Sequence, residues 1–334
     1  MVATAGKTVF LLGAGFVGQH VIEFLLESKY AVTTIVRKEE IAAKLEKAGV
    51  KAILGTLDDH ELITSQVAEH EVTINTSSSD DLPSVQAILA GVRKRVVQDL
   101  PITFIHTSGA GVMIDDARGR YKTDKVYRDD DPADIDALPP TAIHRDVDLA
   151  IVEAAREFGA KARVAIVIPP VVYGFNSNHN RLSMALPVLV KFALKHGFSG
   201  RVGEGRNVWG SVHVADLGRV YPTLVEHLGS EPSSALVENP YFFAENGTEF
   251  SWKEAAEKIG QILYKLGKIP SPETKAWEPS DLKHVIGPAT EIYFGGNSRS
   301  VGTRLPKMGW VPREKDIWAS LEEDEIPYMI ATQI

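Results

Sequence analysis

The sequence predicts an α/β fold in which a doubly wound parallel sheet is followed by a smaller carboxy-terminal lobe. Three observations predict it. Residues 8–12 have strand-forming character and run directly into a glycine-rich turn and an amphipathic helix. Strand-like and helix-like segments then alternate as far as residue 170, which is typical of a parallel sheet with helices on both faces. Beyond residue 170, proline- and glycine-rich pieces separate shorter elements.

Individual elements follow from the same patterns. Six strands are expected in the alternating part, at residues 8–12, 31–36, 50–54, 71–75, 102–107 and 163–168. Helices are expected over residues 39–48, from Pro83 onward and over residues 145–158. Farther along, residues 241–244 could add a seventh strand to the sheet, and Ser251 with Glu254 has the spacing of a capping box at the start of a helix.

These elements suggest a division of the chain. We expect residues 1–170 to form the core of the molecule. Residues 171–334 are expected to form mainly a substrate-binding lobe, with late elements at about 208–228 and 240–246 returning to the core.

Composition excludes several classes of function. The 334 residues are 44% hydrophobic and 24% charged, with a formal net charge of −8. This negative charge, without any basic stripe, argues against a nucleic-acid partner. The absence of cysteine excludes disulfides, thiolate nucleophiles and cysteine-ligated metals. The ten histidines lack the spacing of metal ligands, so no metal site is expected.

The apolar segments indicate where in the cell the protein is expected. No apolar run reaches the roughly 18 residues that a membrane-spanning helix needs, so no membrane segment is expected. The first strand is expected from residue 8, which leaves no room for the apolar core of a signal peptide. These features favour a cytoplasmic protein. The acidic run Asp129-Asp130-Asp131 is expected to be a solvated loop.

Three glycines stand between the first strand and the first helix, in the order Gly13-Ala14-Gly15-Phe16-Val17-Gly18. Between a strand and a helix, this spacing is the dinucleotide-binding fingerprint of the Rossmann fold. Gly13 allows the tight turn, Gly15 lets the backbone approach a pyrophosphate, and Gly18 lets the helix pack closely on the strand. The pyrophosphate would lie on the N–H groups of the first helical turn, at Phe16 and Val17.

The end of the second strand favours NADP over NAD. In NAD-binding folds, an acidic residue about 20 positions after the glycines holds the ribose 2′-hydroxyl. Here Arg37 and Lys38 follow the strand, and no carboxylate ends it. The planar guanidinium suits phosphate oxygens, although Arg37 can also be a surface residue near acidic neighbours. Asp58, just past the third strand, is placed to meet the adenine amine or to cap the next helix.

Five segments give nearly the whole chain a resemblance to the short-chain dehydrogenase/reductase superfamily, in its extended or atypical branch. That branch includes NAD-dependent epimerase/dehydratases and uncharacterised fungal NAD(P)-binding proteins. The segments are Phe16-Val17-Gly18, Thr107-Ser108, Pro169-Pro170-Val171-Val172-Tyr173-Gly174, Val212-His213-Val214-Ala215-Asp216-Leu217 and Met308-Gly309-Trp310-Val311-Pro312. The glycine spacing departs from the Gly-x-x-Gly-x-x-Gly of extended members.

The resemblance implies a catalytic role for one residue and contacts for others. Ser108 follows the fifth strand, where the family has a catalytic Ser or Thr that hydrogen-bonds to the substrate oxygen. The segment that begins at Pro169 is similar to one that lies near the nicotinamide. The expected cofactor contacts beyond the glycine loop are Thr76, Ser77, Pro169 and Val171, and the expected substrate contacts are Tyr173 and His179.

The family's catalytic Tyr-x-x-x-Lys pair is absent from its usual helix. By position, His144 replaces the Tyr and Asp148 replaces the Lys, a couple that can do acid–base work because residues i and i+4 share one helix face. Another interpretation is that the proton donor has been lost. A literal Tyr121-x-x-x-Lys125 lies thirteen residues after Ser108, a spacing similar to the family's, and is a further candidate for the catalytic pair. Its stretch does not read as the required helix.

Together these features predict an NADP-dependent oxidoreductase that acts on a small carbonyl or alcohol substrate. In this interpretation His144, oriented by Asp148, donates the proton, and Arg145 could hold an anionic group. An epimerase, dehydratase or isomerase with a retained NAD(P) is an alternative. So is a non-catalytic, NADP-binding redox sensor similar to NmrA-like regulators. A homodimer is a further expectation, because related folds often dimerise.

Overall fold

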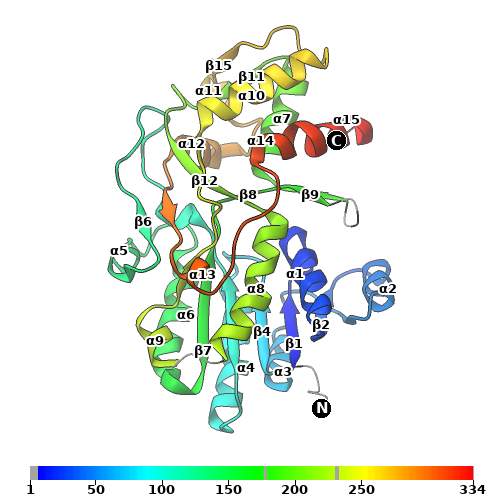
Figure 1. The fold of residues 1–334 in the computed structure, drawn as a ribbon, viewed down its shortest axis with the longest axis vertical. Coiled ribbons are helices and arrows are strands. Elements are labelled where there is room, and N and C mark those ends of the chain that lie inside the picture. Colours follow the sequence, from blue (N-terminus) through cyan, green and yellow to red (C-terminus); the bar gives the residue numbers. More distant parts are fainter. Residues whose placement is uncertain (1–6, 177, 179, 230–232, 334) are drawn as a thin grey trace.

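The computed structural model describes residues 7–176, 178, 180–229 and 233–333. Its centre is a seven-stranded sheet in which every neighbouring pair is parallel, in the order β13-β7-β5-β4-β1-β2-β3 (Figure 1). Its strands are β1 (Thr8–Leu12), β2 (Ala31–Val36), β3 (Lys51–Leu54), β4 (Val72–Asn75), β5 (Thr103–Thr107), β7 (Arg163–Ile168) and β13 (Tyr241–Phe243). The predicted parallel sheet is therefore confirmed, and its seventh strand comes from the distant segment after residue 240.

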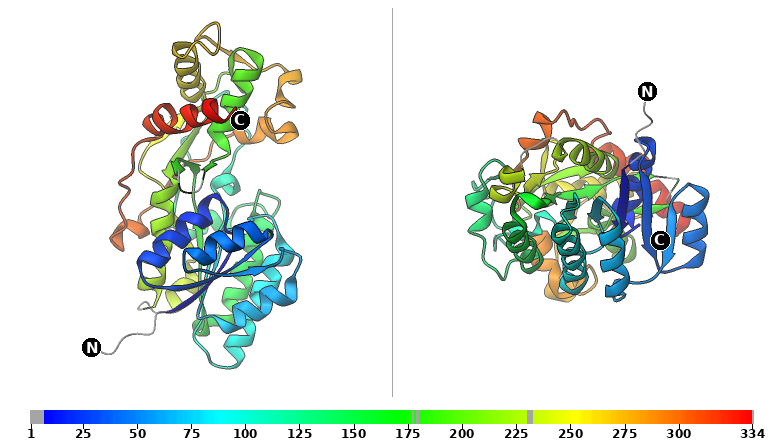
Figure 2. Two further views of the ribbon diagram at one scale, coloured as in Figure 1. Left: turned by 90° about the vertical axis from the view of Figure 1, so that its right-hand side faces the viewer. Right: turned by 90° about the horizontal axis from the view of Figure 1, so that it is seen from below.

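Helices cover both faces of this sheet (Figure 2). They are α1 (Phe16–Glu27), α2 (Glu39–Lys47), α3 (His60–Glu69), α4 (Leu82–Val97), α6 (Arg145–Phe158) and α8 (Val214–Leu228). Side chains alternate along β1: Val9 and Leu11 pack with α1, α2 and α8, whereas Phe10 and Leu12 pack with α3, α4 and α6. This period of two gives the sheet an apolar core on each face, as a doubly wound fold requires.

A second lobe stands at one end of the sheet (Figure 1). It contains the three-stranded sheet β14-β12-β8, formed by β14 (Glu249–Ser251), β12 (Val208–His213) and β8 (Val171–Tyr173). Its other helices and strands are α7 (Ala185–His196), β11 (Ser199–Arg201), α10 (Trp252–Lys265), β15 (Thr274–Ala276), α11 (Pro279–Leu282), α12 (Thr290–Gly295), α14 (Ile317–Ser320) and α15 (Ile326–Thr332). A short π-helix, Leu321–Glu325, joins the last two helices.

Short elements complete the structure. They are β6 (Tyr127–Arg128), α5 (Pro132–Asp136), β9 (Phe175–Asn176), β10 (Arg181–Leu182), α9 (Ser233–Glu238), β16 (Ser300–Val301) and α13 (Arg304–Lys307), with 3₁₀ turns at Ala110–Met113, Gly159–Lys161 and Gly287–Ala289. Because β8 follows β7 directly and enters the second lobe, the carboxyl ends of all the parallel strands face that lobe. The division of the chain at residue 170 stays a prediction.

One acidic residue contradicts the sequence-based expectation of a solvated loop. The side chain of Asp129 is completely buried, while Asp130 and Asp131 are exposed. Its carboxylate accepts hydrogen bonds from the backbone N–H groups of Phe243 (3.1 Å), Thr303 (2.7 Å) and Arg304 (3.3 Å), and from the Thr303 hydroxyl (2.9 Å). Asp129 therefore joins the end of β13 to the start of α13, and these four donors compensate for its burial.

Replacing Asp129 by Ala should lower the free energy of unfolding by about 3 kcal/mol, because four donors lose their acceptor inside the protein. Urea denaturation followed by circular dichroism measures this change. Asp130→Ala is the matched control, since Asp130 is exposed and its ion pair is with the exposed Arg128. Equal stability of the two variants would contradict the structural role of Asp129.

Candidate functional site

The glycine loop after β1 is shaped by two close backbone approaches. Gly13 has a φ of 104°, and a Cβ atom there would lie 2.4 Å from the backbone nitrogen of Ser77. A Cβ atom on Gly18 would lie 1.9 Å from the carbonyl oxygen of Gly13. Neither position can carry a side chain, so the loop, the start of α1 and the end of β4 form one tightly packed unit.

Gly15 differs from the other two glycines, because a Cβ atom there would meet no atom within 4 Å. It is the N-cap residue of α1, and no side chain caps that helix end. The first turn, which begins with Phe16 and Val17, thus presents N–H groups without a side-chain acceptor beside open space. These features fit the pyrophosphate of a dinucleotide.

Two polar residues after β4 hold the loop from the other side. The Thr76 hydroxyl donates to the carbonyl oxygen of Gly13 at 2.8 Å. The Ser77 hydroxyl donates to Asn75 Oδ1 at 2.6 Å. Both residues therefore lie at the loop where the sequence places the cofactor, Thr76 through its hydrogen bond to Gly13 and Ser77 through the close approach of its backbone to Gly13.

The residues expected at the adenosine end lie on the surface. Arg37 and Lys38 directly follow β2 and are exposed, and the Lys38 ammonium lies 3.5 Å from Glu40. Asp58 is also exposed. It does not cap α3: the N-cap residue is Asp59, whose carboxylate accepts a hydrogen bond from the Thr56 N–H at 2.6 Å. The competing interpretation of Asp58 as a helix cap is therefore wrong.

Ser108, at the carboxyl end of β5, is paired with a buried acid. Its Oγ lies 3.0 Å from Oδ2 of Asp148, in a hydrogen bond, and both residues are buried. Oδ1 of Asp148 has no hydrogen-bond partner. Burial raises the pKa of the Asp148 carboxyl to about 7, although the hydrogen bond with Ser108 and the charge of Arg145 oppose this rise.

His144 lies immediately before α6 and has a left-handed backbone, with a φ of 67°. Its Nδ1 lies 2.6 Å from Oδ1 of Asp80, and its side chain is 11% exposed. Its Nε2 lies 3.2 Å and 3.0 Å from the places where Cβ atoms of Gly109 and Gly111 would be. The ring therefore packs over the two glycines that follow Ser108, and larger side chains there would crowd it.

The expected couple of His144 and Asp148 is wrong as a side-chain pair. His144 is the N-cap of α6 and its backbone is left-handed, so it is outside the helical repeat that would align it with Asp148. The ring pairs with Asp80, whereas Asp148 pairs with Ser108. Sequence reasoning missed Asp80. Its position after β4, at the carboxyl edge of the sheet, was the available signal.

Tyr121 and Lys125 lack the geometry of a Tyr-x-x-x-Lys pair. Residues 121–125 form no helix, so the spacing does not bring the two side chains onto one face. Tyr121 is exposed, and the Lys125 ammonium pairs with Asp134. A catalytic role for this pair stays a prediction that no contact supports.

Two basic residues near the site are buried. Arg145 is 1% exposed and donates to the Tyr241 hydroxyl and to the backbone carbonyl of Asp136, both at 3.3 Å. It serves packing between α6 and β13, so the expected contact with an anionic ligand finds no support. His106, in β5, is completely buried, and burial together with the nearby His144 lowers its pKa to about 3.

The residues after β7 differ in what they contact. The Pro169 carbonyl accepts the N–H of Ala110 at 2.9 Å, and Val171 is buried in β8. Tyr173 is 1% exposed, and its hydroxyl donates to the Lys315 carbonyl at 2.9 Å and accepts from Asn246 at 3.2 Å. Tyr173 thus connects parts of the second lobe, and its substrate role stays a prediction. His179 lies outside the described residues.

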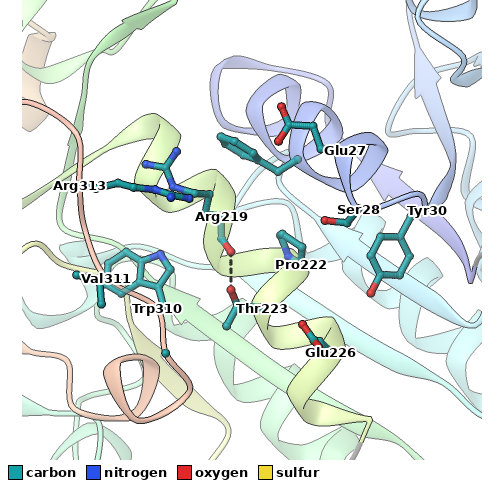
Figure 3. Close-up of a pocket in the computed structure, with 12 residues that line it drawn as sticks. Glu27, Ser28, Tyr30, Arg219, Pro222, Thr223, Glu226, Trp310, Val311 and Arg313 are labelled. Carbon is teal, nitrogen blue, oxygen red and sulfur yellow. Dashed lines mark hydrogen bonds between the residues drawn. The ribbon is translucent and has the colours of Figure 1, made fainter.

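A pocket of about 790 Å³ lies elsewhere, between the last turns of α1, helix α8 and the segment 309–313 (Figure 3). Its lining includes the charged residues Arg219, Arg313, Glu27 and Glu226, together with Trp310. Arg219 is already paired with Asp216 and Glu314. The pocket is at the opposite end of α1 from the glycine loop, so it is separate from the candidate cofactor site.

Other kinds of site are not found in the part of the chain that the structure describes. No group of three His, Asp or Glu side chains there could hold a metal ion. Within the same residues, no helix has the length and apolar character needed to cross a membrane.

Comparison with known proteins agrees with this geometry. Residues 13–131 match a family model described as NAD(P)H-binding. The chain is 28% identical to the oxidase ucsJ of Acremonium sp over 327 residues, which span 92% of this chain and 93% of that protein. It is 25% identical to an uncharacterised protein of Schizosaccharomyces pombe, over 95% of this chain and 98% of that protein.

Solved structures show the same fold. UDP-glucose 4-epimerase of Thermotoga maritima superposes with a TM-score of 0.68 at 16% identity, over 98% of this chain and 100% of that chain. Yeast methylglyoxal/isovaleraldehyde reductase, solved with NADPH, gives a TM-score of 0.61 at 14% identity, over 98% and 99%. The resemblance predicted from the motifs is confirmed: residues 13–131 match an NAD(P)H-binding family model, and the chain has the fold of these epimerase, dehydratase and reductase enzymes.

Gly15→Ala should leave the protein folded but weaken dinucleotide binding by about tenfold or more, since the new methyl group occupies the space that a phosphate needs. Gly18→Ala should instead destabilise the fold, because its methyl group collides with a backbone carbonyl. Thermal unfolding and cofactor titration on both variants separate the two effects. Unchanged binding by a folded Gly15→Ala protein would contradict this location of the site.

Proposed function

We propose that the chain is an NADP-dependent oxidoreductase that reduces, or reversibly oxidises, a small carbonyl or alcohol substrate. The observation that carries this proposal is the couple of His144 and Asp80 beside the glycines that follow Ser108. It offers a proton donor next to the strand end where the resemblance places the reacting oxygen. The NAD(P)-binding domain supports the redox part of the proposal.

The hydrogen bond with Asp80 determines which nitrogen of the His144 imidazole is available for proton transfer. A carboxylate has no hydrogen to donate, so Nδ1–H of His144 donates to Asp80. This bond leaves Nε2 facing Gly109 and Gly111, where it carries a proton in the imidazolium form and accepts one in the neutral form. One residue thus serves as general acid for reduction and as general base for oxidation.

The proposed reaction divides between the cofactor and the chain. When bound, NADPH supplies the hydride that forms the new C–H bond. Ser108 donates a hydrogen bond to the carbonyl oxygen and polarises it. His144 transfers its Nε2 proton to that oxygen as the carbonyl π bond breaks, which yields the alcohol and a neutral imidazole. In the reverse direction His144 takes the hydroxyl proton back, and Asp80 stabilises the imidazolium formed.

NADP preference is supported by the charges after β2. Arg37 and Lys38 are exposed at the strand end, and no acidic side chain occupies the position that would hold a ribose 2′-hydroxyl. A guanidinium there pairs with a 2′-phosphate through two N–H groups. The yeast reductase with the same fold was solved with NADPH.

Arg37→Ala should raise the Kd for NADPH by about tenfold or more and leave the Kd for NADH nearly unchanged, because only NADPH carries the 2′-phosphate. Fluorescence titration with both nucleotides measures this difference. Arg156→Ala is the control, since Arg156 is an exposed arginine on α6. Equal affinity of the wild type for NADH and NADPH would contradict the preference, and binding of neither would overturn the proposed function.

His144→Ala should lower kcat for carbonyl reduction by about 100-fold or more, because the general acid is lost. Asp80→Ala should lower kcat by a smaller factor, since the imidazole remains but loses its orientation. Asp81→Ala is the matched control: Asp81 is the adjacent acid and makes no side-chain cap to α4. A His144→Ala enzyme with full activity would show that another group supplies the proton.

The same measurements separate the alternatives. An epimerase, dehydratase or isomerase would retain NAD(P) through purification and turn over without net cofactor consumption. A redox sensor would bind NADPH without turnover, and its output would be insensitive to His144→Ala.

A further inference from the structure

We propose that Asp148 is a positioning residue that determines which way the Ser108 hydroxyl hydrogen points, according to whether the carboxyl group of Asp148 carries a proton. This inference rests on the proposed function, in which Ser108 donates to the substrate oxygen. It assigns to Asp148 a task different from the orientation of His144 that the sequence suggested.

The single hydrogen of the Ser108 hydroxyl limits how many partners it can donate to. A serine hydroxyl has one hydrogen and can donate only one hydrogen bond at a time. Oγ of Ser108 is 3.0 Å from Oδ2 of Asp148, so the two atoms share a single hydrogen bond. If Asp148 is a carboxylate, it can only accept, and the Ser108 hydrogen is held away from any substrate. If Asp148 is neutral, its own O–H can donate to Oγ, and the Ser108 hydrogen is free for a carbonyl oxygen.

The surroundings of Asp148 favour the neutral form. The residue is completely buried, and its Oδ1 is among the buried polar atoms without a hydrogen-bond partner. A carboxylate so placed would lose most of its hydration and gain one hydrogen bond, which is insufficient compensation for a buried charge. A neutral acid costs less to bury and uses its single O–H in the bond with Ser108.

The charges around Asp148 come from several elements. Arg145 on α6 lowers the pKa of Asp148, whereas Asp146 on α6 and Asp80 after β4 raise it. The His144–Asp80 couple faces the same end of β5 as Ser108. On α4, which packs against α6, Arg93 pairs with Glu157 near the far end of α6. Burial is the largest influence, and the resulting pKa of about 7 makes the proton exchangeable near neutral pH.

The activity is expected to fall as the pH rises. Below about pH 7, Asp148 holds its proton and Ser108 is free to donate. As the pH rises through about 7, Asp148 becomes a carboxylate, takes the Ser108 hydrogen, and catalysis falls. Asparagine mimics the neutral acid at every pH, because its amide N–H₂ can donate to Oγ. The switch should therefore be lost in Asp148→Asn.

The kinetic test compares pH profiles of kcat for wild type, Asp148→Asn, Ser108→Ala and the double variant. The ratio of Asp148→Asn activity to wild-type activity should rise by about tenfold per pH unit above pH 7, because each unit removes a further tenfold of the neutral acid. In the Ser108→Ala background the same ratio should be independent of pH. A pH-independent ratio in both backgrounds would overturn the inference. The His144 step cancels in these ratios.

A second measurement does not depend on turnover. Infrared difference spectra between low and high pH should contain the C=O band of a protonated carboxyl that titrates near pH 7 and is absent in Asp148→Asn. The band should shift in Ser108→Ala, because the acid then lacks its acceptor. Glu325→Gln is the control, because burial raises the pKa of Glu325 to about 7 as well. The band of Glu325 should be lost in Glu325→Gln and kept in Asp148→Asn.

The kinetic and infrared measurements distinguish a failure of this inference from a failure of the proposed function. If Asp148 shows no titrating band, or its band ignores Ser108→Ala, the inference is wrong whatever the enzyme catalyses. If the band behaves as expected but NADPH does not bind, the proposed function fails and the catalytic consequence of the inference fails with it. The hydrogen bond between the neutral Asp148 and Ser108 would then be a structural feature without a catalytic role.

Discussion

The approach of Gly18 to the carbonyl oxygen of Gly13 is the contact on which the site depends. It brings the first turn of α1 against the end of β1 and places the start of the helix at the carboxyl edge of the sheet. Thr76 then donates to the same carbonyl, so the end of β4 is fixed relative to the loop. The loop that carries Asp80 begins at this point. One backbone contact therefore sets both the dinucleotide cradle and the partner of His144.

A second constraint is the way α6 begins. His144 adopts a left-handed backbone, which is costly for a residue with a side chain and is maintained here by surrounding contacts. It turns the imidazole toward the end of β5, where Gly109 and Gly111 leave room for it. In the first turn of α6, Arg145 and Asp148 are buried, whereas Asp146 is exposed. The helix start thus carries one acid–base group that is partly exposed, His144, and one that is fully buried, Asp148.

Sequence reasoning predicted the features that depend on residues within one segment and missed those that depend on residues far away in the chain. The bounds of β1, β2, β7 and α6 follow from residue patterns within each segment, and the structure has them at the expected residues. The positive φ of Gly13 and the contact of Gly18 with the Gly13 carbonyl are also local, because they concern one turn, while the role of Gly15 at a pyrophosphate stays a prediction. Asp129 was misjudged because its four donors come from residues more than a hundred positions away. The pairing of His144 with Asp80 was missed because Asp80 lies 64 positions away, whereas helical spacing suggested a nearer partner.

The late return of β13 to the sheet bears on how the protein forms during synthesis. Tyr241, Phe242 and Phe243 pair with Ile166, Val167 and Ile168, and β7 has no other neighbour on that side. Until the ribosome has passed residue 243, β7 is an apolar edge strand with unpaired backbone groups, a surface that favours intermolecular association. Closure of the sheet must also wait for a contact of long sequence separation, which slows folding. The nascent chain is therefore most exposed to aggregation while the second lobe is being made, and an amino-terminal fragment that ends near residue 170 would retain this open edge.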